Sequence, residues 1–169
     1  MEIKNHPKDG AAVTTMTEDL RISMPASAAA SGFARTLMER RLNKWGYSHV
    51  MDEALLVTAE MVTNAAQATP GKEITLLCRW EAKAVLVAVW DSSPQPPAPA
   101  PVIELTLDDL DLSESRFDAN GGRGLHIVDA LAIDWGYRPD PIDPRSGHSP
   151  GKWVWARLKA VPTGPAEHK

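Results

Sequence analysis

Two kinds of apolar periodicity occupy the first half of the chain, and they predict a strand followed by two helices. Residues 20–25, LRISMP, alternate apolar and polar side chains and end in proline, which is typical of a short strand. Apolar residues then recur three or four positions apart over residues 26–44 and 50–68, which predicts two amphipathic helices. Gly46 and the sequence TPGK at 69–72 are expected to end them.

Short apolar runs dominate the second half of the chain and predict strands. The first two, EITLLCRW at 73–80 and AVLVAVWD at 84–91, are separated by only three residues and predict a hairpin. A proline-rich and then acidic stretch follows at about residues 92–121. Inside a compact domain, a loop this long is a lid, a binding loop or disordered chain. The remaining expected elements are a helix at 125–132 and strands at 133–139 and 152–161.

The order of these elements predicts the fold class. Strand, helix, helix, strand, strand, lid, helix, strand, strand is the order of an α+β domain whose antiparallel strands are covered by helices on one face. The chain has 169 residues, enough for one domain with a core that needs no disulfide or metal. Residues 1–18 and 162–169 are expected to be flexible tails around a domain at 19–161.

Composition and charge argue against several classes of protein. The net charge of -4 and the pI near 5.7 disfavour a protein that mainly binds phosphate backbones. The N-terminus has no apolar signal region, and the longest apolar run, residues 84–90, is too short to span a bilayer. We therefore expect a cytoplasmic protein. The single cysteine, Cys78, lies in an apolar run and is expected to be a core residue rather than a nucleophile.

Glu60 and Asn64 are the first candidate functional residues. They are four positions apart in the second predicted helix, so their side chains project from the same face. Spacing alone favours a simple hydrogen bond between them, or exposure to solvent. The alternative is a divalent metal site, in which the Asn64 carbonyl oxygen binds Mg²⁺ and Glu60 acts as a general base.

Asp91 and the glycines near residue 122 each allow two interpretations. Asp91 ends an apolar strand, where its carboxylate either forms an Asx turn or accepts a hydrogen bond from an exocyclic amine such as that of adenine. Gly121, Gly122 and Gly124 precede a helix, where they either form a hinge or let the backbone approach a phosphate. The glycine pattern matches neither a Rossmann fingerprint nor a Walker P-loop.

The order of these motifs resembles the Bergerat-type ATP-binding fold of the GHKL superfamily. EMVTNA resembles the N box, VWDSSPQPP the G1 box and GGRGLHIVDALAIDWG the G2 box. Together with GKWVWARL, the G2 sequence is most similar to the stand-alone histidine-kinase-like ATPase domains, which are related to anti-sigma-factor serine/threonine kinases of bacterial partner-switching systems. The resemblance implies a two-layer α/β sandwich with a mixed, largely antiparallel sheet and a long ATP lid.

The same resemblance implies a role for each candidate residue. Glu60 would activate the attacking hydroxyl, Asn64 would hold Mg²⁺, and Asp91 would bind the adenine amine. The ATP-binding residues implied by the motifs are Asn64, Asp91, Gly122, Arg123, Gly124 and Leu125. The implied partners are a sigma factor and a STAS-type anti-anti-sigma protein, with dimers common in the family and neither nucleic acid nor membrane bound directly.

Four residues depart from the family pattern and keep a second function open. Ser93 and Pro94 replace glycines of the G1 box, and Ala68 replaces a histidine common one turn after the N-box asparagine. Trp153 stands where a hydroxyl residue is expected to reach the nucleotide, so it is expected to narrow the pocket or to alter the affinity for nucleotide. The expected function is therefore an anti-sigma factor with serine/threonine kinase activity, and the alternative is a non-catalytic interaction module, nucleotide-gated or nucleotide-free.

Overall fold

The helices and strands follow the predicted order, with one added 3-10 turn. The computed structural model describes residues 19–97, 123–140 and 149–160. Its elements are β1 (Leu20–Pro25), α1 (Ala30–Trp45), the 3-10 helix η1 (Ser48–Val50), α2 (Met51–Ala68), β2 (Glu73–Glu81), β3 (Ala84–Asp91), α3 (Arg123–Leu131), β4 (Asp134–Asp140) and β5 (Gly151–Lys159). The predicted tails and residues 98–121 of the predicted lid lie outside the described residues. The domain limits therefore stay a prediction.

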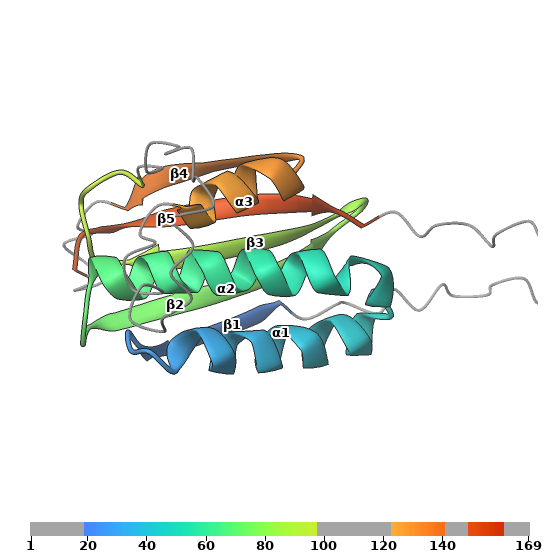
Figure 1. Cartoon of the computed structure of the whole chain (residues 1–169), viewed down its shortest axis with the longest axis horizontal. Helices are drawn as coiled ribbons and strands as arrows, with labels where there is room; N and C mark the ends of the chain where they lie inside the picture. Colours follow the sequence, from blue (N-terminus) through green and yellow to red (C-terminus); the bar gives the residue numbers. More distant parts are fainter. Residues whose placement is uncertain (1–18, 98–122, 141–148, 161–169) are drawn as a thin grey trace, which may run out of the picture.

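The five strands form one sheet in the order β1-β2-β3-β5-β4. All four pairings between the described strands are antiparallel, so the expected mixed sheet is purely antiparallel here. The three α-helices lie on one face of this sheet (Figure 1). The α+β class and the two-layer sandwich are confirmed.

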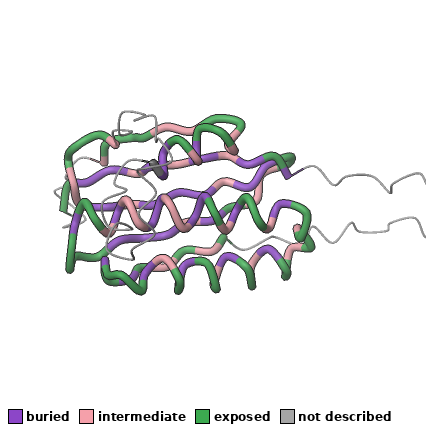
Figure 2. Tube along the Cα trace, viewed as in Figure 1, coloured by how far each residue is buried: buried purple, intermediate pink, exposed green. Residues whose placement is uncertain are grey.

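The core lies between the helices and the sheet face that they cover. Every second residue of β3 points to the helices, and Val85, Val87 and Val89 are at most 1% exposed. A stripe spaced four residues apart on α1 meets them from the other side: Ala30, Ala34, Met38 and Leu42. Figure 2 shows buried segments on the strands and on the inner sides of the helices. Each fully buried large apolar side chain stabilises the fold by about 1.5–3 kcal/mol.

The start of α1 differs from the prediction, and its end agrees with it. The helix begins at Ala30 rather than at residue 26, because Ala26 is held in backbone pairing outside the helix. Its N–H donates to the Lys72 carbonyl at 2.7 Å, and its carbonyl accepts from Gly71 at 3.0 Å. At the other end Gly46 adopts φ 76°, a left-handed conformation that glycine favours and that ends the helix as expected.

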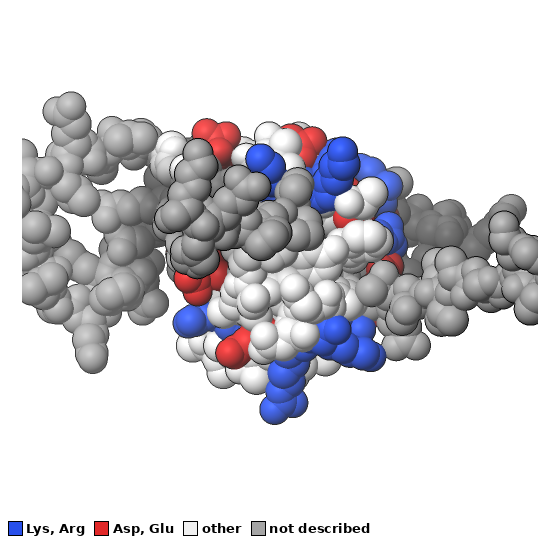
Figure 3. Space-filling model, turned by 90° about the vertical axis from the view of Figure 1, so that its right-hand side faces the viewer, with Lys and Arg blue, Asp and Glu red and all other residues white. Residues whose placement is uncertain are grey.

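Basic residues gather on α1. The helix carries Arg35, Arg40, Arg41 and Lys44 against the single acidic residue Glu39. Figure 3 views the molecule from the end where α1 finishes and α2 begins, and a group of Lys and Arg side chains lies at its lower edge, where α1 lies. The overall negative charge therefore coexists with a locally basic helix.

Two further expectations concern Cys78 and membrane spanning. Cys78 is 0% exposed, and burial raises the pKa of its thiol to about 12, so its interpretation as a core residue is confirmed. No helix within the described part of the chain is long and apolar enough to cross a membrane.

Candidate functional site

A cavity of about 190 Å³ lies between the C-terminal half of α2, the end of β3 and the start of β5. Its walls also include the start of α3 and the proline-rich segment that follows β3. The lining residues are Met61, Asn64, Ala65, Gln67, Ala68, Val89, Asp91, Ser93, Gln95, Pro96, Pro97, Leu125, Lys152 and Val154. Three of the residues predicted for the site, Asn64, Asp91 and Leu125, are therefore brought to one cavity.

Asn64 and Glu60 do not pair with each other. Asn64 lines the cavity, and its Nδ2 is buried without a hydrogen-bond partner among the described residues. This excludes the simple hydrogen bond that spacing favoured. Glu60 lies one turn earlier on α2, outside the cavity lining, and is half-buried. Burial raises the pKa of its carboxyl above the ordinary value, which makes the ionised form a stronger base.

Gly124 is needed for the close approach of α3 to these two side chains. A Cβ at this position would lie 2.5 Å from Glu60 Oε2, 3.1 Å from Glu60 Cβ and 3.4 Å from Asn64 Nδ2. The only described glycines with positive φ are Gly46 and Gly71, so the requirement at Gly124 is for space and not for an unusual backbone conformation. The G2 motif therefore places α3 directly against the N-box residues.

The other G2 residues are described unevenly. Leu125 is 3% exposed and lines the cavity. Arg123 is the first residue of α3, but its side chain lies outside the described part of the structure, as does all of Gly122. The phosphate contacts expected of Gly122 and Arg123 thus stay predictions.

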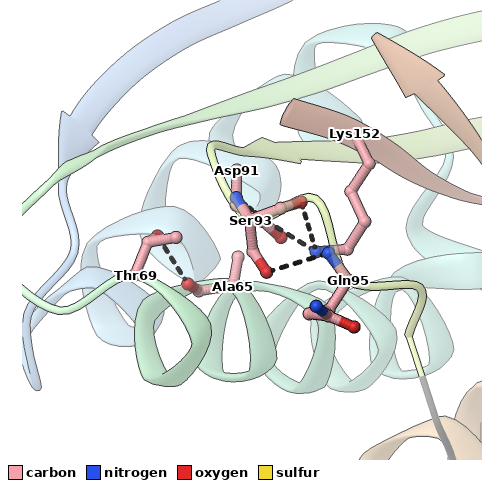
Figure 4. A network of polar contacts seen from close by, with 6 residues as sticks. All are labelled: Ala65, Thr69, Asp91, Ser93, Gln95 and Lys152. Carbon is pink, nitrogen blue, oxygen red and sulfur yellow. Dashed lines mark hydrogen bonds and ion pairs between the residues drawn. The ribbon is translucent and has the colours of Figure 1, made fainter. Parts of the chain in front are cut away.

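Asp91 fits both interpretations of its sequence context. Its Oδ1 accepts a hydrogen bond from the Ser93 N–H at 2.9 Å, which is the Asx turn. The same oxygen accepts a hydrogen bond from Lys152 Nζ at 2.7 Å (Figure 4), in an ion pair whose two side chains are 3% and 6% exposed. Asp91 nevertheless lines the cavity, so the turn holds the carboxylate in place without removing it from the site.

The expectation that Trp153 narrows the pocket is wrong. Side chains of a strand alternate between the two faces of a sheet, and in β5 Lys152 and Val154 face the cavity. Trp153 therefore points to the opposite face, where the Arg21 guanidinium lies 5.4 Å from the centre of its ring. Lys152 is the site residue that the sequence interpretation missed. The sequence KWVW shows that Lys152 and Val154 share a face, but only the register with β3 shows that this face lies at the cavity.

Gly151 permits the junction that brings Lys152 to Asp91. In the register of β3 and β5, Lys152 is paired with Asp91. A Cβ at Gly151 would collide with the Asp91 backbone carbonyl and would lie 2.8 Å from the Trp90 ring. The glycine thus lets the start of β5 approach the end of β3.

Magnesium fits the donors at this site. The described residues hold no group of three or more His, Cys, Asp or Glu side chains that could hold a metal by themselves. Mg²⁺ needs no such group, because it prefers oxygen ligands and takes most of them from substrate phosphates and from water. The buried amide nitrogen of Asn64 has no hydrogen-bond partner among the described residues. A rotation of the amide group exchanges its nitrogen for its oxygen, and the oxygen is then the atom that would bind Mg²⁺.

Comparison with known protein families identifies the domain. The family model of the histidine kinase-like ATPase domain matches residues 24–157, which include the cavity residues from α2 through β5. No curated protein matches the chain in sequence. Because the match spans most of the chain and the fold is the expected sandwich, the chain belongs to the histidine kinase-like ATPase domain family.

Proposed function

We propose that this ATP-binding domain is an anti-sigma factor with serine/threonine kinase activity towards a STAS-type anti-anti-sigma partner, acting in the cytoplasm. The observation that carries the proposal is the meeting of Asn64, Asp91 and Leu125 in one cavity, with Glu60 and Gly124 in contact beside it. Membership of the family supports the binding of ATP. The proposed kinase activity and partners rest on the resemblance of the motif sequences.

Each residue then has one task. Asp91 accepts a hydrogen bond from the adenine amine, and Asn64 holds Mg²⁺. The backbone of Gly122 and Gly124, with Arg123, contacts the phosphates, while Leu125 packs beside the bound nucleotide. When bound, Mg²⁺ neutralises phosphate charge.

Glu60 is the proposed general base. It removes the proton from a partner's Ser or Thr hydroxyl as that oxygen bonds to the γ-phosphorus of ATP and the bond to ADP breaks. Its position beside Asn64 and its raised pKa support this role, because a general base works best when its pKa lies near the working pH.

Nucleotide binding is tested by calorimetric titration of the protein with Mg²⁺-ATP. We expect saturable binding that EDTA weakens, and its loss in Asn64→Ala and Asp91→Ala. Asn43→Ala is the matched control, because Asn43 is exposed on α1 and does not line the cavity. Equal binding by Asn64→Ala and Asn43→Ala would refute the site.

Kinase activity is tested by phosphate transfer from labelled ATP to purified STAS-domain proteins. Glu60→Ala should abolish the transfer and keep ATP binding. Transfer at the wild-type rate by Glu60→Ala would exclude Glu60 as the base. Sigma-factor binding is measured separately, by inhibition of transcription from a sigma-dependent promoter.

One observation favours the second candidate, a non-catalytic interaction module gated by nucleotide. Glu60 does not line the cavity in which Asn64 and Asp91 meet. Under this alternative, Mg²⁺-ATP changes the affinity for the sigma factor, and no phosphate reaches any STAS protein. The same transfer assay distinguishes the two.

A further inference from the structure

Lys152 is a buried lysine in the wall of the ATP cavity. Its side chain is 6% exposed, and lysine is rarely buried to this degree unless it is paired. Its partner is Asp91, which the register of β3 and β5 places directly opposite on the same face of the sheet. The ion pair therefore lies at the end of the cavity where the base of a nucleotide is expected.

The ammonium group has capacity for another hydrogen bond. It donates to Asp91 Oδ1 at 2.7 Å and to the Ser93 carbonyl at 3.3 Å, which accounts for two of its three N–H groups. On Asp91, a single oxygen, Oδ1, accepts both hydrogen bonds, one from Lys152 Nζ and one from the Ser93 N–H. Among the described residues nothing donates to Asp91 Oδ2.

This end of the cavity thus presents a donor next to an acceptor, both fixed by the same network. A ligand that satisfies both must carry an acceptor next to a donor. The Watson–Crick edge of adenine has this arrangement, because ring nitrogen N1 accepts beside the 6-amino group, which donates.

We propose that Lys152 is a specificity residue that donates a hydrogen bond to N1 of the adenine, while Asp91 accepts from the amine. The inference rests on the proposed function, since it requires ATP in this cavity.

The test pairs a single ligand atom with a single side chain. Dissociation constants are measured by calorimetry for ATP and for 1-deaza-ATP, in which a C–H replaces N1. For the wild type we expect 1-deaza-ATP to bind about ten- to a hundredfold more weakly, the range for one hydrogen bond to a charged group. Lys152→Met should bind both nucleotides equally, at the weaker level.

Two further variants separate this contact from loss of charge and loss of folding. Lys159→Met removes a lysine from the same strand at an exposed position outside the cavity, and it should discriminate between the nucleotides like the wild type. The double variant Lys152→Met/Asp91→Asn leaves no unpaired buried charge, so it should fold, and it serves as the control for folding alone because Asp91 itself contacts the adenine.

The outcomes separate this inference from the proposed function. If the wild type binds neither nucleotide, the proposed function fails and the inference falls with it. If ATP binds and 1-deaza-ATP binds equally well, or if Lys152→Met still prefers ATP by the wild-type factor, the inference alone is overturned.

Discussion

Gly124→Ala should fail to stabilise the protein, although alanine is the better helix former. In a helix interior alanine is favoured over glycine by about 0.8–1 kcal/mol, and at Gly124, the second residue of α3, the gain is at most this large. Against this gain, the new methyl would lie 2.5 Å from Glu60 Oε2 and 3.1 Å from Glu60 Cβ. Overpacking costs about 1–3 kcal/mol, and the lower end of this range applies as far as the Glu60 carboxylate, the flexible end of its side chain, turns aside. The two effects together predict a free energy of unfolding between unchanged and about 2 kcal/mol lower.

Gly32→Ala is the matched control. Gly32 is also helical, in α1, and an added Cβ there meets nothing within 4 Å. It should gain up to about 1 kcal/mol, so urea unfolding should separate the two alanine variants by about 1–3 kcal/mol.

The cause of that separation is tested in the background of Glu60→Ala. This change removes the carboxylate and leaves the contacts with the Cβ of residue 60 and with Asn64 Nδ2. Gly124→Ala should then cost less than in the wild type, which a double-mutant cycle measures as a coupling energy. If Gly124→Ala stabilises the wild type as much as Gly32→Ala does, the packing of α3 against Glu60 is not as described.

Three more predictions concern buried ionisable groups. Burial raises the folded-state pKa of Glu60 above its ordinary value of 4.5. The protonated carboxyl therefore contributes to the free energy of unfolding in full below pH 4.5, and this contribution is lost as the pH rises through the raised pKa. Glu60→Gln should therefore resist urea better than the wild type at neutral pH, with an advantage that shrinks towards 4.5; a pH-independent difference would contradict this. Lys152→Met leaves Asp91 buried and unpaired and should lower the free energy of unfolding by about 3–5 kcal/mol, whereas adding Asp91→Asn should restore much of that loss, both measured by urea unfolding. Cys78 should react with a thiol reagent no faster than the protein unfolds, and rapid labelling of the folded state would show that it is accessible.

Most element boundaries were predictable because the signals are local. The apolar run in residues 84–91 and the glycine after α1 predict the structure within a few residues. The start of α1 was not predictable in this way. Ala26 continues an apolar helical pattern, but backbone bonds to Gly71 and Lys72, more than forty residues away in sequence, hold it outside the helix.

The candidate site was predicted in part, for a similar reason. Asn64, Asp91 and Leu125 came from motif order, and they meet at one cavity. Lys152 was missed, and Trp153 was expected at the pocket instead. The period of a strand is two, so a shift of one residue exchanges the face on which a side chain lies.

The sequence by itself determined the hydrophobic periodicity, and with it the helices, the strands and the sandwich. Burial of one helix stripe or one strand face requires apolar residues at a regular spacing, and this spacing can be seen in a short stretch of sequence. It also determined which chemical groups were present. Only the tertiary structure decided which of them share a cavity. The pairing of β5 with β3 aligned Lys152 with Asp91, and the packing of α3 on α2 placed Gly124 against Glu60. Both depend on contacts between segments far apart in the chain. No local sequence pattern states how such segments are aligned with each other.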